Sequence, residues 1–168
     1  PAPEERGIVV GFYPDATSGG NAITAIMGSG IQPTAREFLD RGALRSSLGS
    51  FPAAAPAEAG FAVIAEADGT AGEVKRVSAE LEEAMAEGAL LAPVKITDYG
   101  QVREFWTWRD GVSIAVTAQR GGKISEDVVV PVERLAEAVE ETVQVGERHG
   151  LPACSWGHAG DGNLHSSF

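Results

Sequence analysis

Apolar residues along the first hundred positions alternate between two patterns. Short apolar runs bounded by turn-forming residues are typical of buried strands, and apolar residues spaced three or four apart are typical of helices. A capping box, in which Thr70 and Glu73 satisfy each other's backbone N–H groups, marks the start of one helix. In chain order we expect strand 7–13, helix 17–29, strand 31–39, helix 40–48, strand 61–66, helix 70–87 and strand 90–96.

This order contains two successive β-α-β units. It therefore predicts an α+β fold, with a ferredoxin-like split β-α-β sheet and helices packed on one face. The rest of the chain predicts additional helices and a C-terminal hairpin. A single helix is expected over 98–118, a strand after the glycine pair at 121–122, and a helix from about Pro131 to His149. A strand over 151–156 then leads into the hairpin.

Composition and charge narrow the function classes. The 168 residues are 43% hydrophobic and 22% charged, which is ordinary for a single globular domain. Twenty-four acidic residues against 13 basic ones give a net charge of −11, so a nucleic-acid partner is not expected. No apolar run is long enough for a transmembrane helix. The single cysteine, Cys154, fits a reducing cytoplasm and is expected to be a buried structural thiol.

The most informative segment is Gly-His-Ala-Gly-Asp-Gly-Asn-Leu-His at 157–165. Asp161-Gly162 favours a two-residue type I′ turn, because both central positions need positive φ. That turn would place His158 directly opposite His165, with Cβ atoms about 4.5–5.5 Å apart. Two imidazoles at that spacing can reach one metal ion. The hairpin is therefore a candidate metal site.

Two other interpretations of this segment remain. The histidines could be incidental to a glycine-rich turn. A phosphate cradle built on Gly-x-Gly is disfavoured, because it needs a strand before it and a helix after it. His149 is expected at a helix C-terminus, where a cation is favourable.

Arg109 interrupts an apolar stripe in the helix expected over 98–118. A buried guanidinium needs an anionic partner. That partner could be a ligand, or Arg109 could snorkel or pair with one of the many acidic side chains. The stripe itself consists of Val102, Phe105, Trp106, Val112 and Val116.

Three segments together resemble the C-terminal domain of the FAD-linked oxidases. They are Trp-Thr-Trp-Arg at 106–109, Ser-Glu-Asp-Val-Val-Val-Pro-Val-Glu-Arg-Leu at 125–135, and the hairpin motif at 157–165. The stretch at 31–40 is also similar, so the resemblance covers essentially the whole chain. This family includes the FAD subunit of glycolate oxidase, D-lactate dehydrogenases and D-2-hydroxyglutarate dehydrogenase.

The resemblance implies a ferredoxin-like substrate domain that caps the isoalloxazine ring of FAD. A separate N-terminal domain would hold the flavin. Residues 1–168 would then be one truncated domain, without the FAD-binding domain and without the C-terminal end of the cap. The chain begins at Pro1 rather than Met, which also indicates a piece of a longer protein.

The resemblance also implies site residues. In metal-dependent members, the two histidines of the motif bind a divalent ion, commonly zinc, and they correspond to His158 and His165. A third ligand, a glutamate, and a histidine proposed as catalytic base would follow Phe168. With two ligands alone, we expect weak or absent metal occupancy.

For the substrate, the resemblance assigns the carboxylate-binding arginine to Arg109 and a substrate lysine to Lys123. Ser113 stands where some relatives have threonine. Ser167 stands where some relatives have asparagine.

The implied activity is that of a flavin-dependent 2-hydroxy-acid dehydrogenase or oxidase. It would oxidise glycolate or a small D-2-hydroxy acid to the 2-oxo acid with hydride transfer to FAD, and these residues alone would be inactive. The implied partners are the hydroxy acid, an electron acceptor and partner subunits, in the cytoplasm or membrane-associated through partners. The alternative is a non-catalytic ferredoxin-like module that binds a metal or a small molecule.

Overall fold

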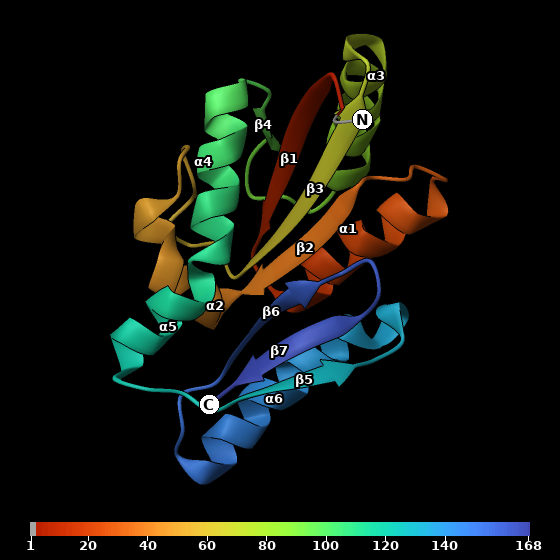
Figure 1. Cartoon of the computed structure of the whole chain (residues 1–168). Coiled ribbons are helices and arrows are strands. Elements are labelled where there is room, and N and C mark those ends of the chain that lie inside the picture. The colour runs from red at the N-terminus through yellow and green to blue at the C-terminus, as the bar shows by residue number, and fades with distance from the viewer. Residues whose placement is uncertain (1–2) are drawn as a thin grey trace.

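One antiparallel sheet organises residues 3–168, which the computed structural model describes. Its seven strands lie in the order β4-β1-β3-β2-β6-β7-β5 (Figure 1). The elements in chain order are β1 (Glu5–Tyr13), α1 (Ala16–Gly28), β2 (Ala35–Asp40), α2 (Arg41–Ser47), η1 (Leu48–Ser50), β3 (Phe61–Gly69), α3 (Ala71–Met85), β4 (Val94–Ile96), α4 (Tyr99–Asp110), α5 (Val112–Arg120), β5 (Ser125–Val129), η2 (Val132–Arg134), α6 (Leu135–His149), β6 (Cys154–His158) and β7 (Asn163–Ser167).

The first four strands form the predicted ferredoxin-like unit. The segments β1-α1-β2 and β3-α3-β4 interleave, so their strands lie in the order β4-β1-β3-β2 with every neighbouring pair antiparallel. Helices α1 and α3 pack on one face of this unit, where Val9, Val63 and Leu81 are fully buried. The predicted α+β class and split β-α-β arrangement are therefore confirmed.

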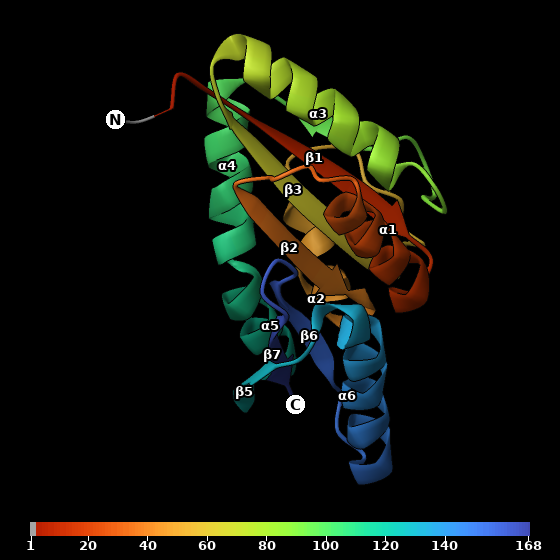
Figure 2. The same cartoon turned by 90° about the vertical axis from the view of Figure 1, so that its right-hand side faces the viewer.

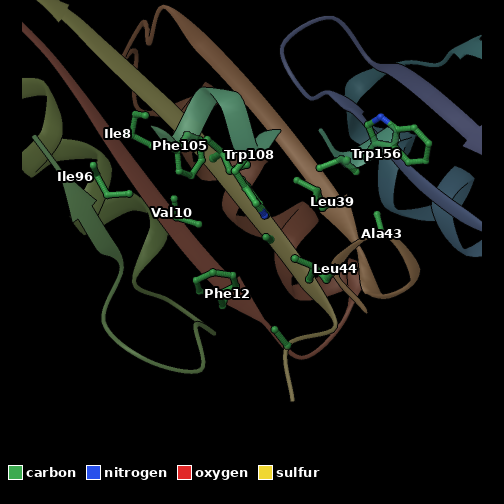
Figure 3. Packing of buried hydrophobic residues seen from close by; sticks show 14 of the residues in the cluster. Ile8, Val10, Phe12, Leu39, Ala43, Leu44, Ile96, Phe105, Trp108 and Trp156 are labelled. Atoms are coloured by element: carbon green, nitrogen blue, oxygen red, sulfur yellow. The ribbon is translucent and has the colours of Figure 1, made fainter. Parts of the chain in front are cut away.

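The additional helices cover both faces of the sheet. Helix α6 lies on the same side as α1 and α3, whereas α2, α4 and α5 lie on the opposite side (Figure 2). On that opposite side, Val10 of β1 and Leu39 of β2 belong to one buried cluster with Phe105 and Trp108 of α4 (Figure 3). Trp156 of β6 extends this cluster toward the hairpin.

Aspartate and threonine caps fix where the helices start. The capping box of Thr70 and Glu73 is present at α3, as predicted. Asp15 caps α1 and Asp98 caps α4. Asp40 is buried and has two roles, because one carboxylate oxygen accepts from Ala43 N–H in α2 and the other accepts from the N–H of Ser155 in β6. It thereby ties the hairpin to the ferredoxin-like unit.

The prediction of a single helix over 98–118 is wrong. The structure has two helices, α4 and α5, which meet at Gly111, a residue with poor helix propensity. The expected stripe is also wrong at one position. Trp108 is buried, with its indole N–H donating to the Ser47 carbonyl at 2.9 Å, whereas Trp106 is only half-buried. The expected strand at 90–96 is reduced to the three residues of β4.

Candidate functional site

The hairpin register differs from the prediction. In the structure His158 faces Asn163, and His165 faces Trp156. The connection is a four-residue loop at 159–162 instead of a two-residue turn. His158 and His165 are therefore diagonal neighbours on the same face of the sheet, not directly opposed residues. Their ring centroids are still only 5.4 Å apart, with the ring planes at 84°.

Backbone geometry explains the longer loop. Within residues 3–168, positive φ occurs at glycines alone, so Asp161 does not adopt the conformation that a type I′ turn requires. Its side chain instead accepts a hydrogen bond from the N–H of Asn163 at 3.1 Å. Gly162 has φ +73°, and its carbonyl accepts from the N–H of Val130 at 3.0 Å. The loop is thus closed by Asp161 and attached to the end of β5.

Each histidine pairs with a carboxylate on the neighbouring strand directly opposite it. Glu37 of β2 faces His158, with its Oε1 atom 2.6 Å from Nδ1. Asp127 of β5 faces His165, with its Oδ1 atom 2.6 Å from Nδ1. Four residues on four adjacent strands therefore form one line across the sheet, which we call the carboxylate–histidine row: Glu37, His158, His165 and Asp127.

The row leaves Nε2 of each imidazole as the nitrogen open to a ligand. The His158 side chain is 47% exposed and that of His165 is 25% exposed, so both rings are accessible. A carboxylate on Nδ1 is the usual support for a histidine that binds metal through its other nitrogen. The chemistry of this pair therefore fits a divalent ion such as zinc. Among residues 3–168, however, no three His, Cys, Asp or Glu side chains are grouped to hold one.

Arg109 lies on α4 above the same face and pairs with the other oxygen of Glu37. Its Nη2 donates to Glu37 Oε2, and both side chains are more than nine-tenths buried. Of the alternatives that the sequence left open for Arg109, the ion pair with an acidic side chain is therefore present. The Nε atom of Arg109 is also buried, and no hydrogen-bond partner for it exists within residues 3–168.

A second buried carboxylate holds α4 against the sheet. Glu66 of β3 accepts from both Arg6, through Nε at 2.5 Å and Nη2 at 2.9 Å, and the indole N–H of Trp106 at 2.5 Å. Trp106 and Arg109 are three residues apart and so lie on one side of α4. Their contacts with Glu66 and Glu37 fix the position of the helix, and therefore of the Arg109 guanidinium.

Lys123 and Ser113, the two other residues that the resemblance assigned to the substrate, contact each other. Lys123 Nζ donates to Ser113 Oγ at 2.7 Å and lies 4.6 Å from the centroid of the Trp156 ring. Trp156 in turn lies beside His165, with ring centroids 5.9 Å apart. Partial burial lowers the pKa of the Lys123 ammonium, and the nearby Arg120 guanidinium lowers it further.

Cys154 does not belong to this site. It is fully buried, and burial raises the pKa of its thiol to about 12. A thiol in this environment is neither a metal ligand nor a nucleophile. The prediction of a buried structural thiol is confirmed. His149 is the last residue of α6, also as predicted.

Outside the row, a cleft of about 700 Å³ lies between α1 and α3. Its lining holds no histidine or cysteine, and its one cation, Arg76, is paired with Glu80. Among its lining residues, this cleft therefore offers no unpaired cation for an acidic substrate.

The whole chain matches a known family model. Residues 2–168 match the model described as "FAD linked oxidases, C-terminal domain". The chain belongs to this family. Among curated relatives, it is 24% identical over 165 residues to the glycolate oxidase subunit GlcD of Bacillus subtilis (strain 168), covering 98% of this chain and 35% of that protein. It is 35% identical over 91 residues to the probable mitochondrial D-2-hydroxyglutarate dehydrogenase of Oryza sativa subsp. indica, covering 54% of this chain and 16% of that protein.

Solved structures share the fold. An alkyldihydroxyacetonephosphate synthase superposes with a TM-score of 0.68 at 14% identity, over 99% of this chain and 36% of that one. A p-cresol methylhydroxylase with substrate bound gives 0.67 at 12% identity, over 98% and 39%. The chain thus spans about a third of the length of the relatives that it matches along its whole length. No helix within residues 3–168 has the length and apolar character to cross a membrane.

The sequence did not single out Glu37 or Asp127. The sequence did carry a signal for Glu37. It lies two residues before Leu39, so both side chains are on the inward face of the strand, where a carboxylate without a cationic partner is costly. Arg109 needed such a partner. Asp127 carried no comparable signal, since its place opposite His165 depends on the pairing of β5 with β7.

Proposed function

We propose that this chain is the substrate-binding part of a flavin-dependent 2-hydroxy-acid oxidoreductase. Its substrate would be glycolate or a small D-2-hydroxy acid, oxidised to the 2-oxo acid. The observation that carries the proposal is Glu37, which contacts both Arg109 and His158. A guanidinium suited to a carboxylate therefore lies next to a pair of imidazoles suited to a metal.

The proposed roles follow from the side-chain chemistry. Arg109 would bind the substrate carboxylate through guanidinium donors that Glu37 does not use. Lys123, held by Ser113, adds a second positive charge near the same anion. His158 and His165 offer Nε2 to a divalent ion, for which zinc is the natural candidate. The local cations make an acidic substrate compatible with the overall charge of −11.

Two bound groups complete the chemistry. When bound, FAD would supply the acceptor for the hydride from the substrate Cα, and the divalent ion would supply Lewis acidity toward the hydroxyl. The residues described here orient the acid and provide two imidazoles. We propose that the remaining metal ligand and the base for the hydroxyl proton come from other parts of the full-length protein.

The test is steady-state oxidation by the full-length protein that contains this chain. Purified protein should bind flavin and reduce an artificial electron acceptor with glycolate, D-lactate or D-2-hydroxyglutarate. Matched acids without the 2-hydroxyl group, such as propionate, should give no reduction. A full-length protein without flavin would contradict the proposal and favour the non-catalytic binding module.

A further inference from the structure

We propose that Glu37 is a positioning residue that fixes the tautomer of His158. In this proposal Arg109 determines which hydrogen-bonding group of residue 37 faces His158. In this arrangement His158 carries its proton on Nδ1 and presents an unprotonated Nε2. The tautomer follows from the contacts of these three side chains. Its consequence for metal binding rests on the proposed function.

Both carboxylate oxygens of Glu37 have a hydrogen-bond partner, Arg109 on one and His158 on the other. Oε2 accepts from Arg109, whose guanidinium can donate but never accept. Oε1 is 2.6 Å from His158 Nδ1. An ionised carboxylate only accepts hydrogen bonds, so the neutral imidazole must place its proton on Nδ1. The lone pair on Nε2 is then free for a ligand.

Burial prevents Glu37 from taking another arrangement. Its side chain is 9% exposed, and that of Arg109 is 8% exposed. Separating the pair would leave two unpaired charges away from water, which is strongly unfavourable. The equivalent pair at the other end of the row is different, because the Asp127 side chain is 67% exposed and has no partner cation among its contacts within residues 3–168. Control of the tautomer is therefore expected to be firm at His158 and weak at His165.

This asymmetry leads to a specific prediction for Glu37→Gln. The amide has one accepting oxygen and one donating NH₂ group. The amide oxygen must accept from Arg109, because a guanidinium can only donate hydrogen bonds. The NH₂ group then faces His158 Nδ1 and makes it an acceptor, which moves the imidazole proton to Nε2. The substitution should thus invert the tautomer and block Nε2 as a ligand.

The experiment is nitrogen–proton NMR of this chain with isotope-labelled histidine, at alkaline pH so that the rings are neutral. Two-bond couplings distinguish the two tautomers. In the unmodified chain His158 should be in the Nδ1–H form, and in Glu37→Gln it should be in the Nε2–H form. Glu66→Gln is the matched control, because Glu66 is an equally buried carboxylate beneath α4 that contacts no histidine. It should leave the tautomer of His158 unchanged.

A double variant tests the role of Arg109. In Glu37→Gln with Arg109→Met, nothing competes for the amide oxygen, so Gln can turn it toward His158. The Nδ1–H form should return. An Nε2–H tautomer in the unmodified chain would overturn the proposal, and so would an unchanged tautomer in Glu37→Gln. If the single variant does not fold, the tautomers in the unmodified chain and in the double variant still test the proposal. The double variant buries no charge at these two positions.

The functional consequence is measured separately. In the full-length protein, Glu37→Gln should weaken zinc binding by about 10–100-fold, the range for loss of a group that supports a metal-bound histidine. An inverted tautomer without any zinc binding in the parent protein would leave the positioning by Glu37 intact and count against the metal in the proposed function. A tautomer that does not invert would overturn the positioning alone.

Discussion

His158 and His165 lie diagonally across the β6–β7 hairpin, with ring centroids 5.4 Å apart. Each ring uses Nδ1 toward a carboxylate directly opposite it on the neighbouring strand. The two carboxylates thus stand at the outer ends of the row, and we propose that the two Nε2 atoms bind one shared ligand. This relationship connects the hairpin to the proposed metal chemistry.

Replacing His158 with Ala should weaken zinc binding by the full-length protein by more than about tenfold, since even the loss of a supporting partner has that effect. The measurement is titration of zinc against a competing chelator. His149→Ala is the matched control, because this histidine ends α6 and is exposed, and it should bind zinc as the parent does. Equal affinities for His158→Ala and the parent would remove the ligand assignment.

Arg109→Lys should raise KM for the hydroxy acid by about tenfold or more. A lysine keeps the charge but lacks the planar fork, and losing one hydrogen bond to a charged group costs about 1.5–3 kcal/mol. Steady-state kinetics of the full-length enzyme provide the measurement. Arg103→Lys, an exposed change on the same helix, should leave KM unaltered. A KM unaffected by Arg109→Lys would reduce Arg109 to a structural partner of Glu37.

Gly162→Ala should destabilise the chain by more than about 2 kcal/mol. Positive φ costs an alanine roughly 1–2 kcal/mol, and its Cβ would lie 1.9 Å from the Val130 carbonyl oxygen. Gly160→Ala is the control in the same loop, since its Cβ would meet only the flexible end of Arg36 at 3.2 Å. Urea unfolding compares the two, and similar midpoints would show that the loop geometry is misassigned.

Asp40 should make stability depend on pH. Burial raises the pKa of this carboxyl to about 6, although the N–H groups of Ala43 and Ser155 oppose the effect. The folded state therefore binds the proton more tightly than the unfolded state, whose Asp pKa is about 3.9. This contribution to stability is fully present below about pH 4 and is lost as the pH rises through about 6.

The measurement is urea unfolding of the parent and Asp40→Asn between about pH 4 and pH 7. The advantage of the parent over the variant should shrink as the pH rises. Asp15→Asn provides the opposite control, because a backbone hydrogen bond from Ser18 lowers the pKa of Asp15. Its contribution should stay constant across this range and be lost only below about pH 4, because the lowered pKa lies under the unfolded value. A pH-independent difference for Asp40→Asn would contradict the assignment.

The sequence predicted those parts of the fold that depend on local patterns. The capping box at Thr70 and the two β-α-β units were confirmed, because their signals lie within a few adjacent residues. The break at Gly111 was missed, since its backbone remains helical and the apolar spacing continues across it. The register of the hairpin was wrong by two residues. That register depends on Val130, which holds Gly162 from outside the loop.

For the site, the sequence could indicate residue types but not their pairing. The histidine motif and Arg109 stood out because glycines, imidazoles and an inward guanidinium are unusual in their contexts. Glu37 was missed because its two contacts come from residues 72 and 121 positions away. Such contacts follow only from the order of strands in the sheet and from the position of α4 above it.

The most direct test of the proposed function is anaerobic mixing of the full-length flavoprotein with single 2-hydroxy acids. The account predicts that glycolate or a D-2-hydroxy acid bleaches the absorption of the oxidised flavin in one turnover, and that the 2-oxo acid is formed in equal amount. Arg109→Lys should require a higher concentration of acid for the same bleaching rate. A flavin that stays oxidised with every small 2-hydroxy acid tested would contradict the account.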